Sequence, residues 1–206
     1  TGATGYIGLH TWLALAEAGF DVIGVDDFRN SSPLALERLA QLLGHAPVFE
    51  RVDVCDRAAL DAVFARHRVD ATVHFAALKA VGESTSQPLA YYGNNLSGLV
   101  AVCEAMLNQG TTRLVFSSSA TVYGQPERLP INEDAFLSAS NPYGQTKLMA
   151  EQILRDLQSA GNAGEYYTPR AVTAFMVDRI DPKPGETLFD PACGTGGFLT
   201  CSIRHM

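Results

Sequence analysis

Two side chains on one predicted helix have the types and spacing of an acid–base pair. Tyr143 and Lys147 follow Asn141 and Pro142, a typical helix start with a capping side chain and a proline in the first turn. Residues four positions apart share a helix face, so we expect the phenol and the ammonium to be neighbours. The ammonium would favour the phenolate form, which makes Tyr143 a candidate general base. The alternative is a solvated helix face without chemistry.

Serines follow a β-type segment that precedes this helix. Residues 113–119 (RLVFSSS) read as a strand that ends in hydroxyl groups. Open parallel sheets bind ligands at the carboxyl ends of their strands. A serine at that edge could therefore hydrogen-bond the substrate oxygen that Tyr143 deprotonates.

The first eight residues, TGATGYIG, carry glycines at the spacing of a phosphate-binding loop. Such a loop lets the backbone approach a pyrophosphate, and the N–H groups of the following helix bind the anion. Asp26 ends a β-type segment about 20 residues later, where an acid that binds a ribose hydroxyl belongs. The motif normally follows a strand, so the first strand is missing from the pattern. A tight turn without a ligand is the alternative.

Strands and amphipathic helices alternate from Thr1 to about residue 160 and would position these groups. We expect strands at residues 21–26, 48–54, 71–77 and 113–119, and helices at residues 7–18, 33–43, 57–66, 88–108 and 142–159. This order predicts an α/β fold, a Rossmann-like doubly wound parallel sheet with helices on both faces.

Composition excludes some classes of function. The 206 residues contain no apolar run long enough to span a membrane, and we expect no membrane partner. A net charge of −7 argues against a broad nucleic-acid-binding surface. The cysteines lack metal-type spacing, so no metal site is predicted, and they are interpreted as reduced thiols of a cytoplasmic protein.

Residues 1 to about 160 resemble the UDP-glucose (UDP-galactose) 4-epimerases of the extended short-chain dehydrogenase/reductase family. The resemblance rests on TGATGYIGLHT, VDDFRNS, HFAALKAVGES, YYGNN, FSSSATVYG and NPYGQTKLMAEQIL. It implies an isomerase with tightly bound NAD and a UDP-sugar substrate. In that family a tyrosine takes the proton of the sugar 4-hydroxyl while a hydride passes to the nicotinamide. A homodimer is the candidate assembly.

The resemblance assigns roles to matching positions of this chain. Tyr143 would be the base, Ser119 its hydrogen-bonding partner, and Lys147 the residue that holds the nicotinamide ribose. The implied cofactor contacts are Gly2, Gly5, Tyr6, Ile7 and Gly8 at the pyrophosphate, Asp26, Asp27, Phe28, Arg29, Asn30 and Ser31 at the adenosine ribose, Asp53 and Val54 at the adenine, and Phe75, Ala76, Ala77, Leu78, Lys79 and Asn94 along the rest of the cofactor.

Residues 161–206 resemble a different family, the adenine-N6 DNA methyltransferase (modification) subunits of type I restriction systems. The resemblance rests on GEYYTPR and DPACGTGGF and implies S-adenosylmethionine as cofactor, with DNA as partner under this interpretation. The implied cofactor contacts are Glu165, Tyr166, Tyr167, Thr168, Pro169, Arg170, Asp190, Thr195, Gly196 and Gly197.

Neither resemblance extends over a whole enzyme. The epimerase substrate domain does not follow the Lys147 helix, and the methyltransferase asparagine–proline–proline–aromatic motif is missing. We expect two partial modules, an NAD-binding domain (1–160) and a partial Rossmann-like methyltransferase segment (161–206), without substantial activity of either kind. Residues 187–190 are a predicted strand that could join the free sheet edge. A methyltransferase fragment with an epimerase-like leader, and a non-functional fusion or designed chimera, remain alternatives.

Overall fold

The computed structural model of the chain describes residues 1–126, 128–161, 177–179, 181–185, 202 and 205. The chain divides into two compact units, Thr1–Gln152 and Ile153–Met206, and each is described by itself. Three sequence-based predictions lie outside the described residues: the cofactor contacts at 165–170, those at 190–197, and the strand at 187–190.

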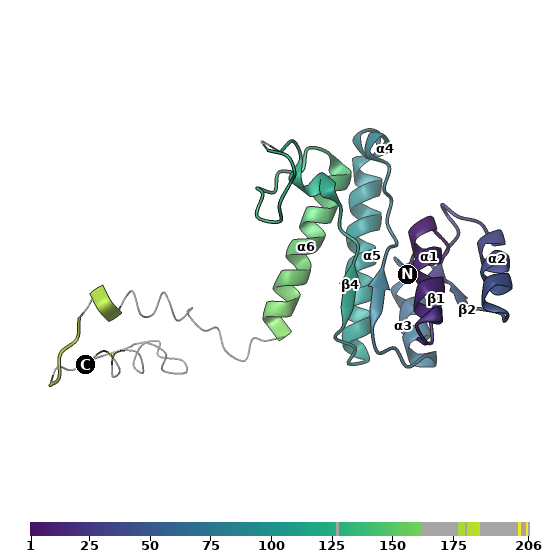
Figure 1. Cartoon of the computed structure of the whole chain (residues 1–206), viewed down its shortest axis with the longest axis horizontal. Helices are drawn as coiled ribbons and strands as arrows, with labels where there is room; N and C mark the ends of the chain where they lie inside the picture. The colour runs from purple at the N-terminus through teal and green to yellow at the C-terminus, as the bar shows by residue number, and fades with distance from the viewer. Residues whose placement is uncertain (127, 162–176, 180, 186–201, 203–204, 206) are drawn as a thin grey trace. The chain divides into compact units, whose positions relative to one another are not determined.

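The first unit alternates helices with short strands (Figure 1). Its elements in chain order are α1 (Tyr6–Glu17), β1 (Ile23–Asp26), α2 (Leu34–Leu43), β2 (Val48–Arg51), α3 (Arg57–Arg66), β3 (Thr72–His74), α4 (Val81–Ser86), α5 (Pro88–Asn108), β4 (Leu114–Phe116), the 3-10 helix η1 (Ala120–Tyr123) and α6 (Pro142–Gly161), which continues past Gln152.

The strands form two parallel pairs, β1 with β2 and β3 with β4. In the first pair Ile23 lies opposite Val48, and in the second Thr72 lies opposite Leu114. The alternation of strands and helices in the sequence predicts parallel pairing. The two parallel pairs therefore confirm the expected α/β class.

The N-terminal residues lie between the two strand pairs at their carboxyl ends. The amino group of Thr1 donates to the carbonyl oxygen of Val73 (2.7 Å), and the Phe75 N–H donates to the carbonyl of Thr1 (3.1 Å). On the other side, the Ala3 N–H donates to the carbonyl of Val25 (3.3 Å). These bonds place β1 and β3 on either side of the glycine loop.

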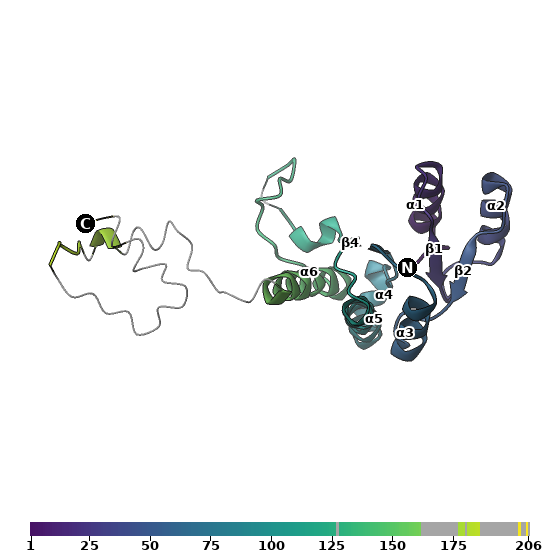
Figure 2. The same ribbon diagram turned by 90° about the horizontal axis from the view of Figure 1, so that it is seen from below.

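Helices cover both faces of this arrangement (Figure 2). Helices α1 and α2 pack together on one face, and α3 and α5 pack together on the other. Each helix pair has its own hydrophobic core. The core under α1 and α2 contains Ala3, Trp12 and Leu39, and the core under α3 and α5 contains Val25, Val54, Leu60, Val63, Phe64, Ala101, Val102, Ala105 and Met106.

Local signals account for several helix starts. The Asp56 carboxylate accepts a hydrogen bond from the Ala59 N–H (3.0 Å) and caps α3. The Asn141 side chain accepts one from the Gly144 N–H (2.8 Å), which confirms the predicted start of the helix that carries Tyr143. Pro88 opens α5, where its missing N–H costs no hydrogen bond.

Among the described residues, no helix combines the length and apolar character that crossing a bilayer requires.

In the second unit, His205 lies between two acids, with Nδ1 3.3 Å from Asp178 Oδ1 and Nε2 3.0 Å from Asp181 Oδ1.

Candidate cofactor site

The carboxyl ends of the strands open onto one cavity of about 370 Å³. Residues that follow each strand contribute to its wall, together with the glycine loop, one residue of α5 and two of α6. The lining residues are Gly2, Gly5, Tyr6, Ile7, Gly8, Asp26, Asp27, Arg29, Asn30, Ser31, Val52, Asp53, Val54, Phe75, Ala76, Ala77, Leu78, Lys79, Asn94, Ser117, Ser118, Tyr143 and Lys147.

This cavity brings together nearly all the site residues predicted for the first unit. Phe28 and Ser119 are the predicted residues that do not line it. Val52, Ser117 and Ser118 line it without having been predicted. Ser117 and Ser118 belong to the segment at which the sequence predicted hydroxyl groups, although only Ser119 was named as a site residue.

The glycine loop and α1 approach each other closely. A Cβ atom on Gly8 would collide with the carbonyl oxygen of Gly2 and would lie 3.0 Å from Ala3 Cα. Helix α1 begins after Gly5, and no side chain in the described part of the chain caps it. Its first-turn N–H groups therefore remain available to an anion, and Tyr6 and Ile7 of that turn line the cavity.

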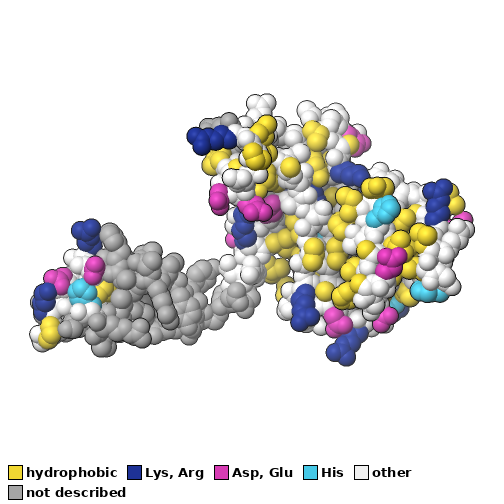
Figure 3. Space-filling model, in the orientation of Figure 1, with side chains coloured by type: hydrophobic (Ala, Val, Ile, Leu, Met, Phe, Trp, Pro, Cys, Tyr) yellow, Lys and Arg dark blue, Asp and Glu magenta, His cyan; other side chains and the backbone are white. Residues whose placement is uncertain are grey.

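The first turn of α1 also leaves apolar side chains at the surface. Tyr6 and Ile7 are 77% and 56% exposed, and the Tyr6 ring packs edge-on against His10 with centroids 4.8 Å apart. Figure 3 shows hydrophobic side chains gathered on this face of the first unit.

Asp26 is held at the carboxyl end of β1 by the loops around it. Its Oδ2 accepts from the Thr4 N–H (3.1 Å), and its Oδ1 accepts from the Phe28 N–H (2.8 Å) and the Ser31 hydroxyl (3.4 Å). A carboxylate offers about four acceptor positions, so one remains for a hydroxyl group in the cavity. This placement suits the ribose-binding role predicted for Asp26.

Lys147 is a buried cation, 4% exposed, at the wall of the cavity. Its Nζ donates to the carbonyl oxygen of Ser117 (2.8 Å) and lies 4.7 Å from the centroid of the Phe116 ring. Burial lowers the pKa of Lys147 from 10.5 to about 8, because the ammonium loses hydration. Lys147 therefore keeps its charge near neutral pH. Tyr143, one turn earlier on α6, lines the same cavity.

Ser119 caps the 3-10 helix η1. Its Oγ accepts from the Thr121 N–H (3.2 Å) and from the Thr121 hydroxyl (2.9 Å). The role of Ser119 as the hydrogen-bonding partner of a substrate oxygen stays a prediction.

Asn95, a buried residue of α5, links the cavity wall to α6. Its Oδ1 accepts from the Leu78 N–H (2.8 Å), and its Nδ2 donates to the Leu78 carbonyl (3.0 Å) and to Thr146 Oγ1 (3.0 Å). The Thr146 hydroxyl in turn donates to the Tyr143 carbonyl (2.7 Å). The sequence did not reveal this link, because a buried amide is recognised by partners far along the chain.

His74, at the end of β3, is buried near Lys147 and should make folding sensitive to acid. Burial, with the charge of Lys147 nearby, lowers the pKa of His74 from 6.5 to about 3. Its Nδ1 lies 2.7 Å from the Thr1 hydroxyl. The folded state therefore rejects a proton that the unfolded chain binds, so the contribution of His74 to stability is complete above about pH 6.5 and is lost as pH drops toward 3.

We expect this histidine to contribute a loss of about 1.4 kcal/mol of unfolding free energy per pH unit in that range. Urea titrations of the wild type and of His74→Gln at several pH values measure it. The variant should lose less stability than the wild type on acidification, and parallel pH profiles would contradict the prediction.

Comparisons with known proteins agree with this geometry. Residues 1–176 match the NAD dependent epimerase/dehydratase family, and residues 148–206 match the N-6 DNA Methylase family. The UDP-glucose 4-epimerase of Bacillus subtilis (strain 168) is 54% identical over 162 residues, which are 79% of this chain and 48% of the relative.

Solved structures of UDP-glucose 4-epimerases are also similar to this chain, among them the following two. The UDP-glucose 4-epimerase from Bifidobacterium longum, in complex with NAD⁺ and UDP, matches with a TM-score of 0.75 and 46% identity over 77% of this chain and 48% of its own. The enzyme from Stenotrophomonas maltophila, with bound NAD and formylated UDP-arabinopyranose, matches with a TM-score of 0.75 and 46% identity over 78% of this chain and 48% of its own.

This chain thus spans about half the length of these relatives. The family match covers most of the chain, residues 1–176, and the strand order and glycine loop agree with it. The chain belongs to the NAD dependent epimerase/dehydratase family.

Proposed function

We propose that this chain binds NAD and supplies the NAD-binding half of a UDP-glucose 4-epimerase. One observation carries the proposal: a cavity at the carboxyl ends of the strands joins the glycine loop, Asp26, Tyr143 and Lys147. The relatives solved with NAD and with UDP or a UDP-sugar support the choice of cofactor and substrate class. Residues 1–160 are the proposed NAD-binding domain.

The residues present fit a dinucleotide. The uncapped first turn of α1 offers N–H groups to a pyrophosphate, and the absence of a Cβ on Gly8 keeps that turn close to the glycine loop. Asp26 is rigidly held and retains acceptor capacity for a ribose hydroxyl. The proposal assigns Lys147 and Tyr143, which line the same cavity from α6, to the nicotinamide end.

The chemistry of the proposed reaction divides between the cofactor and α6. NAD, when bound, supplies a ring that accepts a hydride from the sugar and returns it. Tyr143 would act as the general base that accepts the proton of the sugar 4-hydroxyl. The Lys147 ammonium would hydrogen-bond the nicotinamide ribose. Its bond to the Ser117 carbonyl keeps the ammonium in place. Ser119 is the proposed partner of the sugar oxygen.

The nucleotide that the protein carries tests the proposal. The chain is purified, unfolded in acid, and the released nucleotide is identified by mass spectrometry. We expect NAD, released in proportion to protein. A chain that releases no NAD and does not take it up when NAD is added would refute the proposed function.

A second candidate function concerns the C-terminal part, proposed domain 161–206. The N-6 DNA Methylase match to residues 148–206 favours S-adenosylmethionine binding by a protein with DNA as its partner. The same mass analysis distinguishes the candidates, because S-adenosylmethionine without NAD would support the second and contradict the first.

Assembly and location are further proposals. Three exposed apolar side chains of α5 support a homodimer, which analytical ultracentrifugation would detect: Leu89, Val100 and Leu107.

The free thiols of Cys55 and Cys103 support a reducing, cytoplasmic location.

A further inference from the structure

Arg29 joins three segments that wall one end of the cavity. Its Nη2 lies 2.7 Å from Asp53 Oδ2 and 3.1 Å from Asp27 Oδ2, and its Nη1 donates to Asn94 Oδ1 at 2.6 Å. All four residues line the cavity. One guanidinium therefore ties the loop after β1 to the loop after β2 and to α5, and its planar fork suits such multiple contacts.

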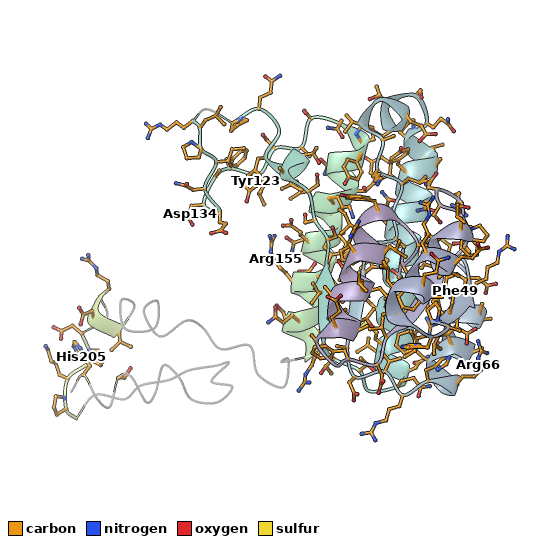
Figure 4. The ribbon with its side chains drawn as sticks, turned by 45° about the vertical axis from the view of Figure 1, so that its right-hand side comes forward. Phe49, Arg66, Tyr123, Asp134, Arg155 and His205 are labelled. Atoms are coloured by element: carbon orange, nitrogen blue, oxygen red, sulfur yellow. The ribbon has the colours of Figure 1, made fainter. Side chains whose placement is uncertain are left out.

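The backbone that carries Arg29 is fixed by its neighbours. Phe28 has a φ of 64°, a left-handed conformation that non-glycine residues adopt infrequently. The Asp26 carboxylate accepts from the Phe28 N–H (2.8 Å), and the Asp27 carboxylate accepts from the Arg29 N–H (2.8 Å). The Phe28 ring packs against Phe49, labelled in Figure 4, with centroids 5.0 Å apart. These contacts fix the backbone from which the Arg29 side chain extends.

Arg29 also determines how the Asp53 carboxylate is held. Asp53 Oδ1 accepts from the Cys55 N–H (2.9 Å), and Asp53 Oδ2 accepts from Arg29. A carboxylate fixed through both oxygens retains lone pairs that only accept hydrogen bonds. It would accept from the exocyclic amino group of adenine. It would repel the carbonyl oxygen that replaces this group in hypoxanthine.

We propose that Arg29 is a positioning residue that gives the cavity its preference for adenine, by holding Asp53 and Asn94 where the base binds. The inference rests on the proposed NAD function. It concerns which base the site accepts. Loss of Arg29 leaves the Asp53 carboxylate with the Cys55 bond and without its second anchor.

Calorimetric titration with NAD and with nicotinamide hypoxanthine dinucleotide tests the proposal. The wild type should bind NAD about tenfold more tightly than the hypoxanthine analogue, since Asp53 is partly exposed and its discrimination is partly screened. Arg29→Met should bind NAD about tenfold more weakly than the wild type and should lose most of this preference. Arg29→Lys should recover part of it, because a single ammonium cannot reach every partner.

Arg51→Met is the matched control. Arg51 is exposed, its guanidinium lies 5.7 Å from the Phe28 ring centroid, and it does not line the cavity. The substitution removes the same charge nearby and should leave the ratio of the two affinities unchanged.

The inference is overturned if Arg29→Met keeps the preference for NAD, or if it weakens both dinucleotides equally. It is also overturned if the wild type binds both with equal affinity, an outcome that leaves the proposed function standing. A wild type that binds neither dinucleotide refutes the proposed function itself.

Discussion

Replacing Gly8 with alanine is expected to abolish NAD binding and to lower the free energy of unfolding by about 3 kcal/mol. The added Cβ would collide with the Gly2 carbonyl oxygen, a backbone atom that cannot rotate away. Helix α1 would have to move off the glycine loop, and its N–H groups would leave the position proposed for the pyrophosphate. Urea unfolding and NAD titration measure the two effects.

Gly93→Ala is the control for this substitution. Gly93 lies within α5, and a Cβ there would meet no atom within 4 Å. Alanine in a helix interior should stabilise the protein by about 0.5–1 kcal/mol and should leave NAD affinity unchanged. A Gly8→Ala variant that binds NAD as the wild type does would show that the glycine loop is not the pyrophosphate site.

Replacing Lys147 with methionine should raise the free energy of unfolding and weaken the binding of NAD. The buried ammonium destabilises the folded state, because its pKa falls from 10.5 to about 8 on folding. Methionine fills similar volume without that cost, so we expect a gain on the order of 1–2 kcal/mol in unfolding free energy at neutral pH. NAD affinity should fall about tenfold or more with the loss of a charged hydrogen bond to the ribose.

The pH dependence identifies the cause of this gain. In the wild type, stability should rise between about pH 8 and 10.5, where the unfolded chain holds the lysine proton and the folded chain has released it. Lys147→Met should lack this rise.

Lys79→Met, a change at an exposed lysine of the same cavity, should leave the unfolding free energy unchanged. A Lys147→Met variant with lower stability and normal NAD affinity would contradict this prediction. It would show that Lys147 has a structural role and does not bind NAD.

Local sequence signals predicted the elements that carry the site. Asn141 and Pro142 marked the start of α6, and Pro88 marked that of α5. The carboxyl ends of the predicted strands supplied most of the cavity wall, because parallel strands meet at one edge.

The features that the sequence did not predict depend on contacts between residues that lie far apart along the chain. The strand expected at residues 71–77 is shorter, Thr72–His74, and the Phe75 N–H that follows it donates to the carbonyl of Thr1. Helix α4 was missed because VGESTS has no apolar periodicity, and it packs against α5.

Hydrogen-bond partners that lie far along the chain could not be predicted from the sequence either. Asn95 binds Leu78 and Thr146, which lie 17 and 51 residues away. Ser119 has the position expected at the end of a strand, yet its hydroxyl caps η1. Phe28 does not line the cavity and its ring packs on Phe49, so its predicted contact with the ribose stays a prediction.

The most direct test of the NAD-binding site is to titrate the nucleotide-free chain with NAD while following its backbone amide signals by NMR. We predict saturable shifts at the glycine loop, around Asp26 and at Lys147, from residues that line one cavity. No change on adding NAD, or shifts confined to residues elsewhere in the chain, would contradict the proposed site.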